Sequence, residues 1–188
     1  MIDEIESTGL SSWIDAVRQH HSQTYQHCLL VTGVAVAFGQ HLGLGAEDRN
    51  RLSFGGMMHD IGKALVPVVI LEKPGPLDED EMAMMQKHAD YGAVALKSAP
   101  SLQPEMAEIV VNHHEYLDGS GYPRGLKARD ISDLVRILTI CDVYSALIET
   151  RAYKPPLPSQ QAYEALLEMG PKLDRDLVRE FSFVTRTS

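Results

Sequence analysis

The sequence contains little cysteine, no long apolar run and no excess of positive charge. Only Cys28 and Cys141 are cysteines, far apart within apolar helical patterns, so neither a disulfide framework nor a zinc knuckle is expected. No apolar run approaches the roughly 18–20 residues of a membrane span. The opening residues MIDEIESTGL lack the basic and apolar segments of a signal peptide. These absences predict a soluble cytoplasmic protein without a membrane partner.

The net charge of the chain is −9, so the broad basic surface that nucleic-acid binding requires is missing. We therefore expect no nucleic-acid polymer as a partner. A small anionic ligand is still compatible with this charge, provided that it binds in a locally positive pocket.

Alternating apolar and polar segments bounded by hairpin turns are also missing, which argues against a β-sheet. Apolar residues instead recur at helical spacing, and Asp78 with Glu81 has the pattern of a capping box. With 188 residues and 44% hydrophobic content, the chain is predicted to be a single all-α domain. We expect a helical extension over 1–22 before a domain over 23–188, with helices at 23–42, 47–61, 78–98, 104–114, 130–148, 159–169 and 173–183.

Polar residues interrupt several of these apolar helices. One histidine on an apolar face is usually a hydrogen-bonded core residue, but a buried carboxylate needs a partner or a metal because its desolvation is costly. It is improbable that so many polar residues lie in apolar helices for unrelated reasons, and one cluster that faces the interior explains all of them. Its predicted members are His27, His59, Asp60, His88, His113, His114 and Asp142.

Seven such side chains exceed the four that a tetrahedral zinc ion needs, and they favour two divalent ions of nearly octahedral geometry. The adjacent His59 and Asp60 suit a centre in which the carboxylate bridges both ions. Two divalent ions outweigh the two aspartates, so the pocket would attract phosphate despite the acidic chain. Paired ions of this kind catalyse phosphoryl transfer.

Two motifs extend this interpretation to a family. HDIGK (59–63) together with HHEYLDGSGYP (113–123) resembles the HD-GYP family, a branch of the HD-domain metal-dependent phosphohydrolases. The similarity covers about residues 23–184 and includes ILEKPGPL, KHADYGA and CDVYSAL. It implies a bundle of about seven or more helices, two iron or manganese ions, and hydrolysis of cyclic di-GMP to pGpG or GMP.

The resemblance also implies roles for single residues. The seven cluster residues match the family's metal ligands, and Asp60 and Lys63 match catalytic positions. Lys63 corresponds to a contact of the scissile phosphate, and it follows Asp60 by three residues, which favours the same helix face. Tyr122, Arg151 and Lys154 are expected to contact the substrate. The GYP loop is a possible docking site for a diguanylate cyclase (GGDEF) domain, and Glu115 is expected to support a ligand histidine.

Two departures from the family pattern qualify these expectations. Gln23 stands where members with a third metal carry glutamate, so two ions are predicted. Ser145 stands where the family usually has aspartate, which weakens the expected support of Lys63. A regulatory module that binds the cyclic dinucleotide or a partner without hydrolysis stays open as an alternative. Another cyclic dinucleotide, or linear pGpG, stays open as the substrate.

Overall fold

The computed structural model describes residues 10–97, 104–150 and 155–185. Within these ranges the chain forms helices and no strand, apart from an isolated bridge between Asp118 and Lys127. The all-α prediction is confirmed. None of the described helices is both long and apolar enough to span a membrane. Arg151 and Lys154, two of the expected substrate contacts, lie outside the described residues.

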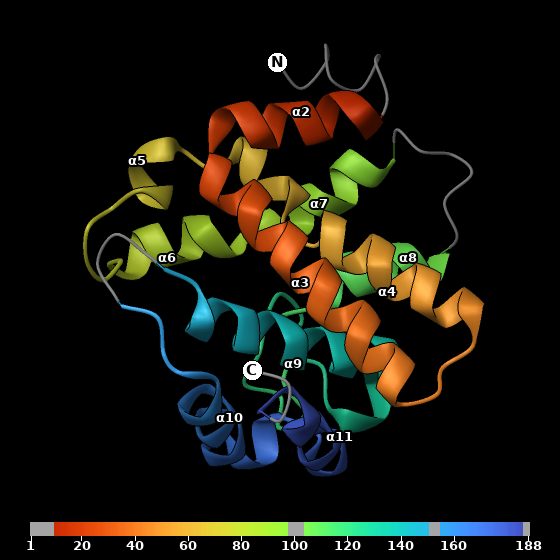
Figure 1. Ribbon diagram of the computed structural model, residues 1–188. Helices are drawn as coiled ribbons and strands as arrows, with labels where there is room; N and C mark the ends of the chain where they lie inside the picture. Colours follow the sequence, from red (N-terminus) through yellow and green to blue (C-terminus); the bar gives the residue numbers. More distant parts are fainter. Residues whose placement is uncertain (1–9, 98–103, 151–154, 186–188) are drawn as a thin grey trace.

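The helices form a compact bundle, with α2 at one end and α10 and α11 at the other (Figure 1). The long helix α3 runs beside α4, and α9 packs against both. In chain order the elements are α2 (Leu10–His20), α3 (Ser22–His41), α4 (Ala46–Met58), η1 (Ile61–Leu65), α5 (Val68–Leu71), α6 (Glu79–Gln86), α7 (His88–Leu96), α8 (Pro104–Asn112), η2 (Ala128–Asp130), α9 (Asp133–Ile148), α10 (Ser159–Glu168), η3 (Gly170–Lys172), α11 (Arg175–Glu180) and η4 (Phe181–Thr185), where η denotes a 3₁₀ helix.

Buried apolar side chains form two clusters. The larger joins α3, α4, α9 and the C-terminal helices, and it contains Phe38, Leu138 and Phe181. The smaller joins α2, the end of α4, η1, α7 and α8, and it contains Val17 and Ile61. Helix α2 therefore contributes to the core, although it falls within the predicted N-terminal extension. The boundary at residue 22 stays a prediction.

The helices occur where the sequence predicts them, but several end earlier. The segment predicted as one helix over 78–98 is two helices that meet at Lys87. There the Nδ1 atom of His88 donates to the carbonyl of Met85, which in a continuous helix would accept the N–H of residue 89. The capping box of Asp78 and Glu81 is present as predicted. At the C-terminus, Asp174 caps α11, which begins at Arg175 and ends before the 3₁₀ helix η4.

Two glycines allow the backbone to close around the centre of the bundle. A Cβ atom on Gly56 would lie 2.7 Å from the Cα atom of Thr32, so α3 and α4 approach closely at this point. A Cβ atom on Gly62 would lie 2.0 Å from the carbonyl oxygen of His88. Any larger residue would push these elements apart, and the polar side chains on them would separate.

Candidate dinuclear metal centre

Three histidines follow the C-terminal ends of helices. His59 directly follows α4 and His113 directly follows α8, whereas His88 comes one residue after the C-cap of α6 and is the first residue of α7. The last carbonyls of a helix have no partner within the helix. In each case the Nδ1 atom donates to the carbonyl three residues earlier, at 2.9, 2.7 and 2.7 Å respectively. Because a carbonyl only accepts, Nδ1 carries the proton, and the Nε2 lone pair of each neutral ring is free to bind a metal.

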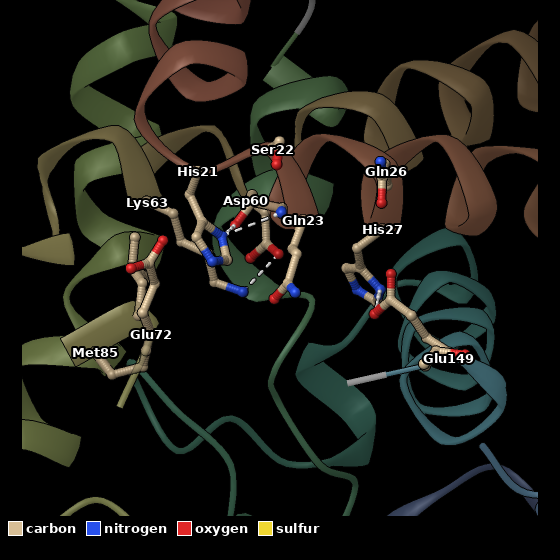
Figure 2. A pocket seen from close by; sticks show the side chains of 13 residues that line it. His21, Ser22, Gln23, Gln26, His27, Asp60, Lys63, Glu72, Met85 and Glu149 are labelled. Carbon is tan, nitrogen blue, oxygen red and sulfur yellow. Dashed lines mark hydrogen bonds and ion pairs between the residues drawn. The ribbon is translucent and has the colours of Figure 1, made fainter. Parts of the chain in front are cut away.

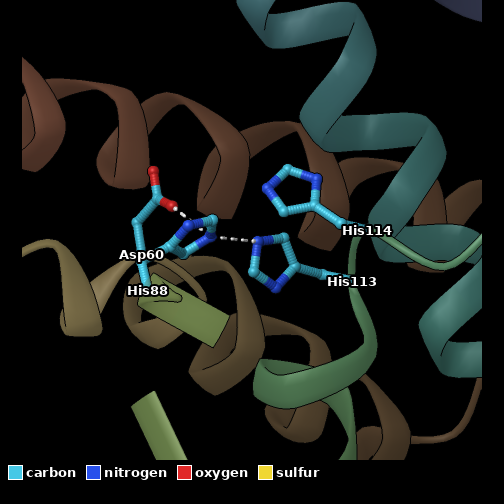
Figure 3. Close-up of side chains that lie close together, drawn as sticks. All are labelled: Asp60, His88, His113 and His114. Carbon is cyan, nitrogen blue, oxygen red and sulfur yellow. Dashed lines mark hydrogen bonds and ion pairs between the residues drawn. The ribbon is translucent and has the colours of Figure 1, made fainter. Parts of the chain in front are cut away.

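The seven predicted ligands come together in two adjacent groups. Asp60, His88, His113 and His114 form one group, and their rings and carboxylate converge on one point (Figure 3). His27, His59 and Asp142 form the other. Within each group the ligand atoms lie within 4.8 Å of one another, a spacing from which one ion can be bound.

Asp60 lies between the two groups. Its Oδ1 atom is 3.4 Å from Nε2 of His88, and its Oδ2 atom is 3.4 Å from Nε2 of His59. One carboxylate oxygen therefore faces each group, which is the arrangement a bridging ligand requires. Asp142 has a similar position, with Oδ1 2.8 Å from Nε2 of His27 and Oδ2 3.7 Å from Nδ1 of His114.

Some buried polar atoms at this centre have no hydrogen-bond partner among the described residues. Nε2 of His59 and Oδ1 of Asp60 are buried without a hydrogen bond. The Nε2 atoms of His88 and His113 lie 3.3 Å apart, although both are bare when the rings are neutral. Two facing lone pairs repel unless a cation lies between or beside them, and unpaired buried polar groups are costly. Nitrogen and oxygen donors in this number fit two divalent ions of the iron or manganese type.

The pKa values of most of these side chains leave their candidate ligand atoms unprotonated at neutral pH. Burial lowers the pKa of His88 to about 4 and that of His114 to about 3, so these rings are neutral. Burial raises the pKa of Asp60, but the Lys63 ammonium and His59 outweigh this effect and hold it well below its usual range. His27 differs: burial lowers its pKa, but the hydrogen bond with Asp142 and the nearby carboxylate of Glu149 raise it to about 9.

Lys63 lies directly beside this centre. Its Nζ atom donates to Oδ2 of Asp60 at 2.6 Å, and its side chain is partly exposed. The expected proximity of Lys63 and Asp60 is confirmed, although Lys63 belongs to the 3₁₀ helix η1 and not to an extension of α4. Ser145 does not support Lys63 within the part of the chain that the structure describes, since its Oγ atom is buried there without a hydrogen bond.

A cavity of about 590 Å³ opens onto the centre, where His27, Asp60 and Lys63 line it. His21, Lys63, Glu72 and Met85 lie on one side of the cavity, and His27 and Glu149 lie on the other (Figure 2). Gln23, which stands where family members with a third metal carry glutamate, also lines the cavity. The volume suits a small-molecule ligand.

The HD domain family matches residues 11–177 of the chain. The chain belongs to this family. Cyclic di-GMP phosphodiesterase PA4108 of Pseudomonas aeruginosa is 32% identical over 186 residues, which are 96% of this chain and 45% of the relative. The 3'3'-cGAMP-specific phosphodiesterase 2 of Vibrio cholerae is 38% identical over 154 residues, covering 81% of this chain and 30% of the relative. The chain thus spans less than half the length of either.

Solved structures share the fold of this chain. Bd1817, an HDG"Y"P protein from Bdellovibrio bacteriovorus, superimposes with a TM-score of 0.72 at 20% identity, over 86% of this chain and 52% of that one. The PgpH HD domain of L. monocytogenes, in complex with cyclic-di-AMP, gives 0.68 at 17% identity over 94% of both chains. With the signatures at 59–63 and 113–123, these findings confirm the resemblance to HD-GYP domains.

The GYP loop folds back onto the metal centre. The ring of Tyr122 lies 4.6 Å from that of His114, centroid to centroid, and Tyr122 is not among the described residues that line the large cavity. The expectation that Glu115 bonds a ligand histidine is wrong. Its buried carboxylate instead accepts the backbone N–H groups of Arg124 at 2.6 Å and Leu126 at 2.9 Å. Glu115 therefore fixes the loop, and the loop in turn covers His114.

Glu115→Ala is expected to lower the free energy of unfolding by roughly 3 kcal/mol or more, because it removes two hydrogen bonds to the carboxylate of Glu115, and a hydrogen bond to a charged group contributes roughly 1.5–3 kcal/mol. Urea denaturation followed by circular dichroism measures this loss. Glu168→Ala, at an exposed position at the end of α10, is the matched control and should change stability little. Equal stability of both variants would show that Glu115 does not hold the loop.

Sequence reasoning missed Glu149. Its carboxylate lies in the cavity wall, with Oε2 3.3 Å from Nδ1 of His27. The only hint in the sequence is that Glu149 follows Asp142 by seven residues, or two helical turns; in the structure it directly follows the last residue of α9.

Proposed function

We propose that this chain is the catalytic domain of a metal-dependent phosphodiesterase that hydrolyses cyclic di-GMP to pGpG or GMP. The observation that carries the proposal is the pair of ligand groups joined by Asp60 beneath a cavity of ligand size. Relatives named cyclic di-GMP phosphodiesterases support the choice of substrate. Since the chain covers only part of those proteins, their activity is assigned to it here as a proposal.

Each ligand group would hold one ion, with iron and manganese as the expected metals. When bound, such a pair lowers the pKa of water and offsets negative charge on phosphoryl oxygens. The side chains of the protein hold the two ions in place. Asp60 holds the two groups together, and the three helix-end histidines keep their Nε2 atoms directed inward.

Lys63 is the described cation best placed to meet the substrate. Its ammonium group lies on the cavity floor beside Asp60, where it can donate to a non-bridging phosphate oxygen and offset charge that develops during cleavage. Arg151 and Lys154, which follow the cavity residue Thr150 in sequence, are proposed as further phosphate contacts. Tyr122 is proposed to act close to the centre through its contact with His114.

Recruitment of a GGDEF domain through the GYP loop stays a prediction. The loop presents exposed residues, among them Ser120 and Arg124, that a partner could contact. The ring of Tyr122, however, packs against His114, so a partner would meet the edge of the loop and not a free tyrosine.

Turnover of purified protein, reconstituted with Mn²⁺ or Fe²⁺ under reducing conditions, tests the proposed function. Cyclic di-GMP, 3'3'-cGAMP, cyclic-di-AMP and linear pGpG should be compared by chromatographic analysis of the products. We expect pGpG or GMP from cyclic di-GMP. A protein that holds both reduced ions and binds cyclic di-GMP but leaves it intact would refute hydrolysis and favour the regulatory module.

Lys63→Ala is expected to lower kcat by roughly 10²–10³, the usual cost of losing one group that stabilises transition-state charge. Both ions should stay bound, because Lys63 is not a ligand. Steady-state kinetics with metal analysis measures the two effects separately. Lys97→Ala, at an exposed lysine that caps α7, is the control. Unchanged kcat in Lys63→Ala would remove Lys63 from the mechanism.

A further inference from the structure

His27 differs from the other ligand histidines in its position on the backbone. It lies inside α3 (Ser22–His41), not after the end of a helix. Carbonyls within a helix already accept the N–H groups four residues later, so none is left to orient the ring. His27 therefore needs a side chain to hold its Nδ1 atom, whereas His59, His88 and His113 use backbone carbonyls.

Glu149 occupies the place of that missing carbonyl. Its Oε2 atom is 3.3 Å from Nδ1 of His27, a buried atom that makes no hydrogen bond among the described residues. On the other side, Nε2 of His27 is 2.8 Å from Oδ1 of Asp142. The imidazole thus lies between two carboxylates that belong to the same segment of chain.

The backbone fixes the position of Glu149. Its N–H donates to the carbonyl of Ser145 at 3.0 Å, so the residue continues directly from the last turn of α9. Its side chain is mostly buried in the cavity wall, with 17% of its surface exposed. Because Asp142 lies within α9 and Glu149 directly follows its last residue, the ligand and the carboxylate beyond His27 belong to one continuous segment.

We propose that Glu149 is a positioning residue for the metal group formed by His27, His59 and Asp142. It accepts the Nδ1 proton of His27, fixes the tautomer and ring orientation, and directs Nε2 toward the metal. This arrangement of carboxylate, histidine and metal strengthens the ligand, and loss of such a partner typically weakens metal binding roughly 10–100-fold. The inference rests on the proposed metal centre but not on the identity of the substrate.

Titration of Mn²⁺ into chelator-treated protein by isothermal calorimetry tests the proposal. The wild type should bind two ions, and Glu149→Ala should weaken one of them by roughly 10–100-fold while the other is unchanged. Glu149→Gln keeps an oxygen that accepts from Nδ1 and should recover part of the lost affinity. Glu168→Ala, at an exposed glutamate at the end of α10 that does not line the cavity, is the control and should bind both ions as the wild type does.

Three results would overturn the proposal. The first is wild-type affinity for both ions in Glu149→Ala, and the second is a Glu149→Gln variant that binds Mn²⁺ no better than Glu149→Ala. The third is a wild type that binds three ions and a Glu149→Ala variant that binds two, since Glu149 would then be a metal ligand itself. Glu149→Ser, whose short side chain cannot reach His27, replaces the alanine variant if that one does not fold. Since the readout is Mn²⁺ binding, an inactive wild type that binds two ions would refute hydrolysis and leave the role of Glu149 intact.

Discussion

Asp60→Ala is expected to abolish the hydrolysis of cyclic di-GMP and to release metal from the protein. The carboxylate faces Nε2 of His59 with one oxygen and Nε2 of His88 with the other, so its removal takes a ligand from both groups at once. It also leaves the ammonium group of Lys63 without its 2.6 Å partner. The loss should exceed the roughly 10²–10³-fold expected from a single phosphate contact, since it affects the metal ions themselves.

Product analysis and metal analysis on the same samples check this result. Asp60→Asn keeps the shape of the side chain but not its charge, and it should also lose activity, which separates the loss of a bridging anion from a packing defect. Asp90→Ala, at an exposed aspartate in the first turn of α7, should behave as wild type. If Asp60→Ala kept two ions and normal turnover, Asp60 could not be the bridge.

The sequence predicts the helices well and their ends less well, for a reason visible at the metal centre. Apolar periodicity does not distinguish a helix that runs through a histidine from one that stops before it. At His59, His88 and His113 the ring bonds the carbonyl three residues back, and the helix ends or is interrupted there. The histidines that are predicted to bind metal thus also set the helix ends that the periodicity places too late.

The clustering of the seven candidate ligands could be predicted because each is a polar residue in an apolar segment and because the two signatures occur together. Glu149 and Glu115 could not be assigned in this way. Their partners, His27 for Glu149 and the backbone of Arg124 and Leu126 for Glu115, depend on how distant segments pack. Residues that support the candidate ligands are therefore harder to identify from sequence patterns than the ligands themselves.

The acidic groups around the cavity make anion binding depend on the ions. Asp60, Asp142, Glu72 and Glu149 contribute four negative charges near the centre, against the ammonium group of Lys63. A protonated His27 adds one positive charge, and the sum is still negative. Two divalent ions reverse its sign. The charge balance drawn from the seven ligands alone omits Glu72 and Glu149 and overstates the attraction for phosphate.

Removal of the metal ions is therefore expected to abolish the binding of cyclic di-GMP as well as its hydrolysis. The ligand carries two phosphodiester charges, and a charge pair about 4 Å apart is worth roughly 4 kcal/mol at an effective dielectric constant near 20, so affinity should fall at least about 100-fold. Calorimetry with a hydrolysis-resistant phosphorothioate analogue compares chelator-treated protein with the same protein after Mn²⁺ is restored. Recovery on adding Mn²⁺ is the control for unfolding during treatment. Undiminished binding by the metal-free protein would mean that other residues, such as Arg151 and Lys154, provide the affinity, and that the metal centre is not what draws the anion into the cavity.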